Sequence, residues 1–277
     1  SFAAGMRMEN MLRDLSLKDK TGNLDEDYSL DFTKLFPSAS IIYQWKDRLS
    51  FNLAYSKRIE RTTTFKMNPF PEREHSETLE QGDPNLHPEL IDQVELGVNY
   101  KTKKGNSIFS NFYYRNVNHL INRVNTVYND TILNRIYSNV GNANVIGREM
   151  TADYPLSKKF KLLLSSNYYY TIIKGSFDGH TVNTDASASN YNINATYRFS
   201  DKAFAQFNFN YISNRITAQG IDSEYYSPNL TLSRRFWNNQ LTATLQWKNI
   251  DMGLLNSNEQ RITTSRTGEF YTTTNYV

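Results

Sequence analysis

Leu49-Ser50-Phe51-Asn52-Leu53-Ala54-Tyr55-Ser56 is the stretch that decides the fold class. Large apolar side chains occupy every second position, and small or polar side chains occupy the positions between them. A period of two is typical of a β-strand whose two faces lie in unlike environments, and helical spacing fits none of this stretch. The stretch therefore predicts a strand with one apolar face and one polar face.

The same alternation recurs in residues 94–100, 191–199 and 241–248. Short turn signals join such runs at residues 46–47, 104–106, 157–159, 200–202 and 238–239, as tight hairpins do. Between these hairpins the connections are long and polar, and they cover residues 14–34, 57–89, 116–139, 173–185, 214–225 and 251–263. We therefore expect about twelve antiparallel strands, with every tight turn at one end of the sheet and every long loop at the other.

This asymmetry favours an up-and-down transmembrane β-barrel over a soluble sandwich, in which connection lengths are mixed. The mean hydropathy of -0.63 agrees, because barrel strands alternate lipid-facing and lumen-facing residues and their hydropathy averages out. No apolar run approaches the roughly 18 residues that a membrane-spanning helix needs.

The cysteine content and the charge exclude other classes of site. The absence of cysteine excludes disulfides and thiolate metal sites. The net charge is only +3 and the basic residues are scattered, so no nucleic-acid partner is expected.

Aromatic residues lie near both ends of the expected strands. Trp45, Phe199, Phe236 and Trp237 lie beside tight turns, while residues 168–170 are three tyrosines towards the long loops. Amphipathic rings prefer the headgroup zone of a bilayer, so the sequence predicts two aromatic belts. The alternative is that β-rich proteins use many aromatic residues in any environment.

Two groups of polar residues are candidate contacts for a ligand or a polar solute. Arg58, Arg61, Asp83, His87 and Glu89 lie in or beside the longest loop, which is long enough to fold over a pore mouth. The alternative is a solvated loop. On the polar faces of two successive strands, a row of amides offers donors and acceptors towards the lumen, and the alternative role of that row is to solvate the lumen. Its members are Asn190, Asn192, Asn194, Asn208 and Asn210.

The four histidines, at 75, 87, 119 and 180, show none of the short spacings that metal sites use. We therefore read them as polar loop residues and expect no metal site, cofactor or catalytic residue. A hydrolase in the barrel wall would have to use His119, near the rim, as its base, but no serine lies in a nucleophile motif.

Several motifs occur in the order found in a known family: Gly5-Met6-Arg7-Met8-Glu9, Phe36-Pro37-Ser38, Asn68-Pro69-Phe70, Gly82-Asp83-Pro84-Asn85-Leu86-His87-Pro88-Glu89, Glu95-Leu96-Gly97, Asn139-Val140-Gly141 and Gly147-Arg148-Glu149. With these motifs the whole chain resembles the barrel region of TonB-dependent outer-membrane receptors, in the branch known as the outer-membrane β-barrel family. Asp83 departs from the asparagine that is usual at that motif position.

The resemblance implies an outer-membrane location in a Gram-negative bacterium and active import of a scarce nutrient through a plugged barrel. It implies as partners the lipid bilayer, a plug domain in the same parent chain, the TonB complex, a surface lipoprotein, and a small-molecule or oligosaccharide solute. The plug and roughly the first half of a 22-stranded barrel would precede Ser1. We therefore expect residues 1–277 to form one partial barrel domain.

Two other classes stay open at this point. A non-transport barrel or an adhesion protein would use similar strands, but a soluble adhesin should carry charges at the middle of its outward faces. An outer-membrane hydrolase would need a serine and a histidine within about 2.6 to 3.2 Å of each other on neighbouring strands.

Overall fold

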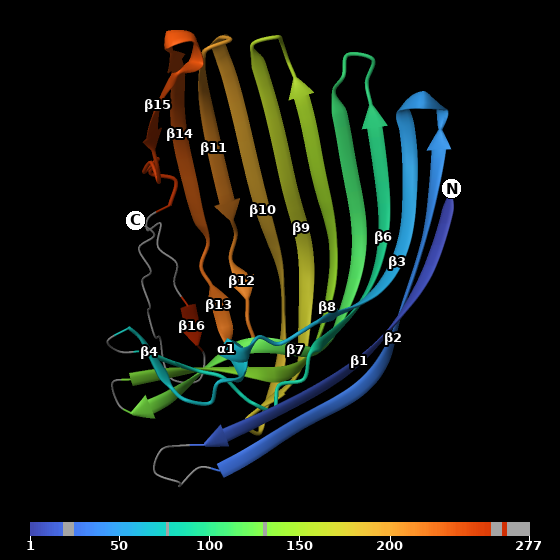
Figure 1. Cartoon of the computed structure of the whole chain (residues 1–277), viewed down its shortest axis with the longest axis vertical. Helices are drawn as coiled ribbons and strands as arrows, with labels where there is room; N and C mark the ends of the chain where they lie inside the picture. Colours follow the sequence, from blue (N-terminus) through green and yellow to red (C-terminus); the bar gives the residue numbers. More distant parts are fainter. Residues whose placement is uncertain (19–24, 76–77, 130–131, 256–261, 265–277) are drawn as a thin grey trace.

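The computed structural model describes residues 1–18, 25–75, 78–129, 132–255 and 262–264. It shows one long, curved antiparallel sheet (Figure 1). Eleven strands follow one another in the order β1-β2-β3-β6-β7-β8-β9-β10-β11-β14-β15. Their bounds are β1 Phe2–Lys18, β2 Asp25–Trp45, β3 Leu49–Glu60, β6 Glu89–Lys101, β7 Ser107–Asn129, β8 Ile132–Pro155, β9 Phe160–Phe177, β10 His180–Ser200, β11 Ala203–Ile212, β14 Tyr225–Phe236 and β15 Leu241–Trp247. The predicted antiparallel, up-and-down sheet of a barrel segment is confirmed.

The tight turns lie at one end of the sheet, at the top of Figure 1, as the sequence predicts. Two of them are single 3-10 turns, η1 (Lys46–Arg48) and η2 (Trp237–Asn239). Gly105 takes a φ of 85° in the turn between β6 and β7, a left-handed conformation that glycine adopts without strain. The sequence predicts a further strand after the connection 251–263, and residues 265–277, where most of it would fall, lie outside the described residues.

Three of the predicted long loops are wrong: they are largely paired strand. β1 and β2 stay in register from Phe2↔Ile41 to Lys18↔Asp25, and β9 and β10 stay paired up to Phe177↔His180, where only a two-residue turn remains. β7 and β8 continue in the same way as far as Asn129↔Ile132. Beyond the membrane both faces of a strand meet water or protein, so apolar alternation is lost although the backbone hydrogen bonds persist. Alternation therefore marks the membrane portion of each strand and not its end.

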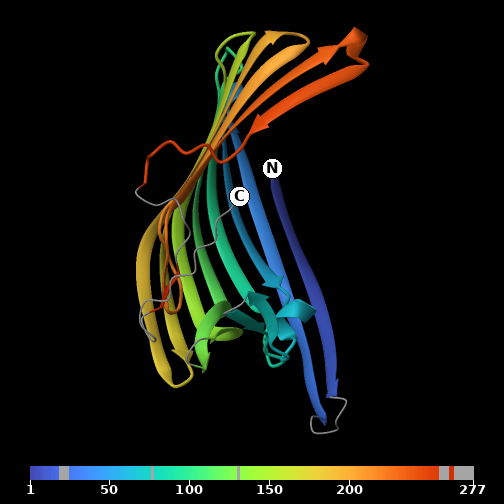
Figure 2. The same ribbon diagram turned by 90° about the vertical axis from the view of Figure 1, so that its left-hand side faces the viewer.

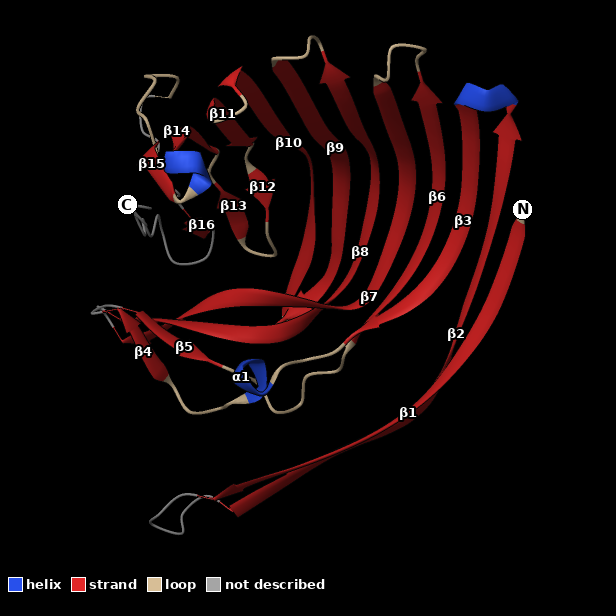
Figure 3. Cartoon of the chain, turned by 45° about the horizontal axis from the view of Figure 1, so that its top comes forward, coloured by secondary structure: helices blue, strands red, loops and turns tan. Residues whose placement is uncertain are grey.

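The other two described connections are loops with short elements of their own. Between β3 and β6 lie α1 (Thr64–Met67), β4 (Glu72–His75) and β5 (Thr78–Gln81), and β5 pairs in parallel with β8. Between β11 and β14 lie β12 (Arg215–Ile216) and β13 (Gly220–Asp222), which form a small sheet with β16 (Ile262–Thr264). Figure 3 shows both loops on the concave side of the arc, where β7 and β8 also bend across the open end.

The convex face of the sheet carries the apolar side chains. Leu53, Leu96, Phe112 and Ile146 are all more than two-fifths exposed there, on four different strands. On β2 the outward row runs from Leu35 to Trp45, ten residue steps or about 33 Å of strand. At a tilt of about 40° such a row spans about 25 Å, the height of a membrane barrel's apolar band. Apolar residues in this position are what hydrocarbon requires and what a soluble adhesin would avoid.

Tyrosines mark the edge of this band that lies farther from the tight turns. Tyr55 donates to Asp92 at 2.7 Å, Tyr114 donates to Asn144 at 2.7 Å, and Tyr168 donates to the Ser187 hydroxyl at 3.1 Å. Each phenol bonds a polar group on the neighbouring strand, as a residue at a membrane–water boundary does. The rings beside the tight turns, Trp45 and Trp237 among them, are also exposed, so aromatic side chains lie at both ends of the apolar band.

The end opposite the tight turns has a small hydrophobic core. It is formed by the portions of β7 to β10 nearest that end and by the loop between β11 and β14, and its buried members are Val117, Val124, Val140, Ala143, Ile173, Val182 and Ala218. Figure 2 shows how far the strands curve to bring these segments together. No helix in the described ranges is long and apolar enough to cross a membrane.

Candidate functional site

The concave face presents polar side chains to the lumen, and its clearest feature is an asparagine row on β10 and β11. The register pairs Asn192 with Asn210 and Asn194 with Asn208. Asn192 donates to Asn210, and Asn194 donates to Asn208 at 2.6 Å. The five amides predicted from the sequence therefore lie on one face, and four of them bond in cross-strand pairs. Those bonds use part of each amide's capacity and leave donors and acceptors for the lumen.

Asn190 lies beside this row at the edge of an open hollow. The hollow has a volume of about 370 Å³ and is lined by residues of β8, β9, β10, β11 and β14, including Glu149, Asn167, Asn190 and Asn210. The Asn190 side-chain oxygen is buried without a hydrogen-bond partner among the described residues. A buried acceptor without a partner favours a site for a polar group with a donor, such as a hydroxyl or an amide.

Two arginines on the lumen wall share one buried amide. Arg58 donates to the Oε1 atom of Gln93, and the Nε of Arg115 donates to the same oxygen at 3.1 Å. Gln93 is only 6% exposed, whereas Arg58 is exposed. The Arg115 guanidinium also lies 5.5 Å from the Tyr113 ring centroid, which fixes its position. Two guanidinium groups held this close, with no carboxylate in ion-pairing distance in the described ranges, favour an anionic group between them.

The ligand contact predicted for Arg61 stays a prediction, and the structure places its guanidinium in an ion pair. It pairs with Glu9, which also pairs with Arg7 at 2.9 Å. Both arginine side chains are about three-fifths exposed, so the pairs contribute at most about 1 kcal/mol each. Arg61 therefore ties the start of the long loop to β1.

The other three predicted loop residues lie in the segment 82–89, which is anchored to the barrel wall. Asp83 accepts the backbone amide of Asn85 at 2.8 Å and so closes a tight turn. Glu89 accepts the backbone amide of Ile121 at 2.6 Å. Burial raises the pKa of Glu89, and the Ile121 amide opposes that rise. Leu86 is fully buried between these polar contacts. Asp83 and Glu89 thus hold the backbone in place through their side chains.

His87 and His119 come together at the mouth, although they are 32 positions apart in the sequence. Asn139 joins them, because its amide nitrogen donates to the carbonyls of His87 at 3.0 Å and His119 at 2.7 Å, and its oxygen accepts the His87 amide at 2.8 Å. The two imidazole centroids are 5.5 Å apart. Burial, and then the charges of His119 and Arg13, lower the pKa of His87 and favour its neutral form. His119 therefore contacts another imidazole, and no serine hydroxyl in the described residues hydrogen-bonds it.

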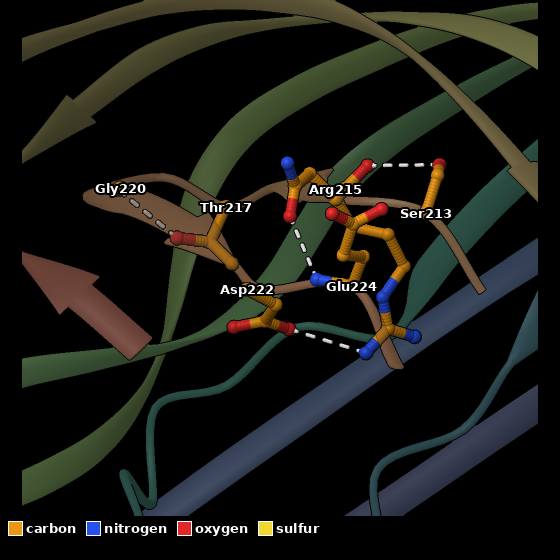
Figure 4. Close-up of polar contacts among 7 residues, drawn as sticks. Ser213, Arg215, Thr217, Gly220, Asp222 and Glu224 are labelled. Atoms are coloured by element: carbon orange, nitrogen blue, oxygen red, sulfur yellow. Dashed lines mark hydrogen bonds and ion pairs between the residues drawn. The ribbon is translucent and has the colours of Figure 1, made fainter. Parts of the chain in front are cut away.

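The loop between β11 and β14 folds against the inner wall and closes a second, smaller hollow of about 250 Å³. Figure 4 shows the ion pair of this loop, in which Arg215 contacts Asp222 at 3.3 Å. Burial raises the pKa of Asp222, and Arg215 opposes the rise. The Gln219 side chain binds the backbone of Asn125 on β7: it accepts the Asn125 amide and donates to the Asn125 carbonyl at 3.0 Å. This loop is therefore fixed across the mouth.

The long loop is tied to the bent tips of β7 and β8 from the other side. Glu80 of β5 accepts from Tyr137 at 2.8 Å and pairs with Arg123 at 3.2 Å. Asn134 donates to Gln81 at 2.7 Å. The two loops and the strand tips thus form one connected cover over part of the lumen.

Sequence reasoning missed Gln93, Arg115, Asn139, Arg215 and Asp222. The period of two already places Gln93 and Arg115 on polar faces, but their meeting depends on the register of β6 and β7. Asn139 lies in one of the motifs that carry the family resemblance, without an assigned role. Arg215 and Asp222 lie where alternation has ceased, so no signal in the sequence marks them.

Residues 1–277 match the outer membrane protein beta-barrel family. The chain belongs to this family. Its location is therefore the outer membrane of a Gram-negative bacterium, with the lipid bilayer around the convex face. By family convention the tight turns are periplasmic and the longer end is extracellular. No curated protein matches the chain.

Solved structures with the same fold are transporters and receptors of the outer membrane. They include the copper transporter OprC (TM-score 0.60, 15% identity, 90% of this chain and 40% of that chain). The FrpB iron transporter from Neisseria meningitidis (TM-score 0.58, 13% identity) and the ferric-catecholate import receptor Fiu from E. coli K12 (TM-score 0.56, 13% identity) each match 90% of this chain and 38% of theirs. At these identities the likeness shows the fold alone. The chain spans about two-fifths of the length of these structures.

Proposed function

We propose that this chain is the C-terminal part of a TonB-dependent importer that brings a scarce nutrient across the outer membrane. The observation that carries the proposal is the pairing of an apolar convex face with a polar lumen whose mouth is covered by anchored loops. In this proposal the parent chain also carries a plug domain and further barrel strands, which fits the two-fifths of each importer that the chain covers.

The lumen contacts favour a polar solute with acidic groups. Arg58 and Arg115 offer two guanidinium groups to an anionic oxygen, and the row at Asn190 offers amides to hydroxyl or carbonyl groups. A ferric siderophore and an acidic oligosaccharide both have this chemistry. A surface lipoprotein that delivers such a solute fits the same role. The chain in this proposal carries no catalytic step.

The test is uptake by cells that carry or lack the gene for the parent protein. Cells would be offered an iron-loaded catecholate siderophore, copper ions and labelled oligosaccharides, with and without functional TonB. We expect uptake of one class that requires both this protein and TonB, and a severalfold loss in an Arg58→Gln, Arg115→Gln double variant that still reaches the outer membrane. Uptake that persists without TonB would contradict active import.

A further inference from the structure

The convex face has an apolar hollow beside the tight turns. The hollow lies between β11, β14 and β15 and has a volume of about 560 Å³, within the range of about 300 to 1,000 Å³ that small-molecule sites occupy. Its lining comes mainly from outward-facing residues of these strands and of the end of β10: Phe199, Ala203, Leu232, Arg234, Phe236, Ala243 and Leu245. In the outer membrane this surface faces the periplasmic leaflet.

One charged side chain borders this hollow. Arg234 pairs across the ladder with Ala203 on one side and Ala243 on the other, so it shares their outward face. Its guanidinium lies 5.0 Å from the centroid of the Phe236 ring. In the described parts of the chain, no carboxylate comes within ion-pairing distance of it. A guanidinium that faces lipid and has no carboxylate partner in the protein extends towards the headgroup zone, where lipid phosphates can neutralise its positive charge.

The position of Arg234 matches that zone. It lies two residues before β14 ends at Phe236, and Trp237, which is 73% exposed, follows directly. Tryptophan at such a position marks the headgroup level of a bilayer. Lys202 lies in the turn between β10 and β11, close to Arg234 in the structure. Its backbone carbonyl accepts the backbone amide of Arg235, the next residue, at 2.8 Å. Two cations therefore lie at the depth of lipid phosphates, directly beside an apolar hollow.

We propose that this hollow is a binding site for an anionic phospholipid of the periplasmic leaflet. Arg234 binds the phosphate through charge-assisted hydrogen bonds, and Lys202 adds attraction for the net negative charge. An acyl chain fills the hollow between Phe199, Leu232 and Leu245. The site selects lipids by net charge, because zwitterionic lipids carry a compensating ammonium group.

The chain offers a matched control in the next residue. Arg235 carries the same charge and is also exposed, but it pairs with Thr242 and so belongs to the lumen face. Arg234→Gln and Arg235→Gln thus remove one positive charge at the same depth from opposite faces. Arg234→Lys retains the charge, and Ala243→Phe fills the hollow without changing charge.

The experiment measures lipid binding to the full-length protein in detergent by native mass spectrometry, with phosphatidylglycerol and phosphatidylcholine as probes. We expect the wild type to prefer phosphatidylglycerol, and Arg234→Gln to bind it about 5- to 10-fold more weakly. Arg234→Lys should keep the preference for phosphatidylglycerol, Arg235→Gln should bind like the wild type, and Ala243→Phe should lose binding with its charge intact. Equal loss in both glutamine variants, or equal binding of the two lipids by the wild type, would overturn the proposal.

Discussion

Replacing Asn139 with alanine is expected to release the segment 82–89 from the barrel wall. The substitution removes three hydrogen bonds, two to the backbone of His87 and one to the carbonyl of His119. Each such bond contributes about 0.5 to 1 kcal/mol near the surface, so their loss lowers the local opening free energy by about 1.5 to 3 kcal/mol. This corresponds to about a 10- to 100-fold increase in the open population.

Hydrogen exchange followed by mass spectrometry measures this quantity directly. The backbone amide of His87 donates to Asn139, so its protection from exchange reports directly on the hydrogen bonds by which Asn139 clamps the segment 82–89. A peptide that covers residues 82–89 should exchange about 10- to 100-fold faster in the variant, while a peptide from β10 within the membrane should not change. The full-length protein in detergent is the sample for both measurements.

Asn142 provides the control for this experiment. It lies three positions further along β8, is exposed, and makes no side-chain hydrogen bond in the described structure. Asn142→Ala should leave the exchange of residues 82–89 unchanged. If Asn139→Ala also leaves that exchange unchanged, the segment is held by Leu86 and Glu89 alone, and Asn139 does not act as its clamp.

Three further predictions concern stability. Gly175→Ala should destabilise the protein by about 2 to 4 kcal/mol, because the new Cβ would lie 1.8 Å from a backbone oxygen of β8. In the control Gly179→Ala, the new Cβ meets no atom within 4 Å, and the cost should be about 1 kcal/mol. Thermal unfolding in detergent compares the two variants, and equal destabilisation would refute the close approach at Gly175. Leu53→Arg on the lipid face should lower the free energy of unfolding by about 2 to 4 kcal/mol, measured by denaturant titration in lipid vesicles, while Ala54→Arg on the lumen face should lower it by less than about 1 kcal/mol. The reverse order would show that the lipid face and the lumen face are assigned the wrong way round. Burial raises the pKa of Glu89, so the native state binds this proton more tightly than the unfolded chain, and stability falls as pH rises from the ordinary value of 4.5. Glu89→Gln should therefore unfold at a higher temperature than the wild type at pH 7 but not at pH 4, and parallel curves at both pH values would contradict the shift.

The membrane portion of the fold follows from the sequence because hydrocarbon imposes a simple rule. Every outward residue within the apolar band must be apolar or have its polar atoms satisfied, and this rule produces the alternation seen at residues 49–56. Arg148 is a charged residue on the outward face that meets the second of these conditions. It lies 5.2 Å from the Phe112 ring centroid and donates to the Ser110 hydroxyl at 3.0 Å, so neighbouring side chains satisfy its guanidinium.

The extracellular end could not be predicted in the same way, because no uniform solvent acts on it. Residues 116–139 contain Asn, Arg and Thr on both faces of the strand, and such a sequence resembles a polar loop. They are ordered by long-range contacts instead, such as the bond between Gln219 and Asn125, which are 94 positions apart. A pattern within a short window contains no information about a partner at that distance.

The candidate site also contains contacts that a local pattern predicts and contacts that depend on long-range pairing. The row from Asn190 to Asn210 could be predicted because alternation and a tight turn fix which residues face each other across β10 and β11. The contact of Arg58 with Gln93 could not, because it also requires the register between β3 and β6 across a connection of 28 residues. Asp83 and Glu89 were predicted to contact a ligand, and the structure gives their carboxylates backbone amides to bind. Their role as ligand contacts stays a prediction.

The two ends of the strands therefore differ in what a substitution costs. Within the membrane an outward leucine contacts lipid chains, which adapt to any apolar shape, so volume changes at Leu53 should be tolerated. At the mouth, Val140 is fully buried among valine, alanine and isoleucine side chains that cannot rearrange as lipids do. Val140 also lies between Asn139, which clamps the loop, and Gly141, whose φ of 128° brings β8 close to β9. A smaller residue at Val140 would leave a cavity beside Asn139, so packing at Val140 supports both the local stability and the placement of the segment 82–89 that Asn139 holds.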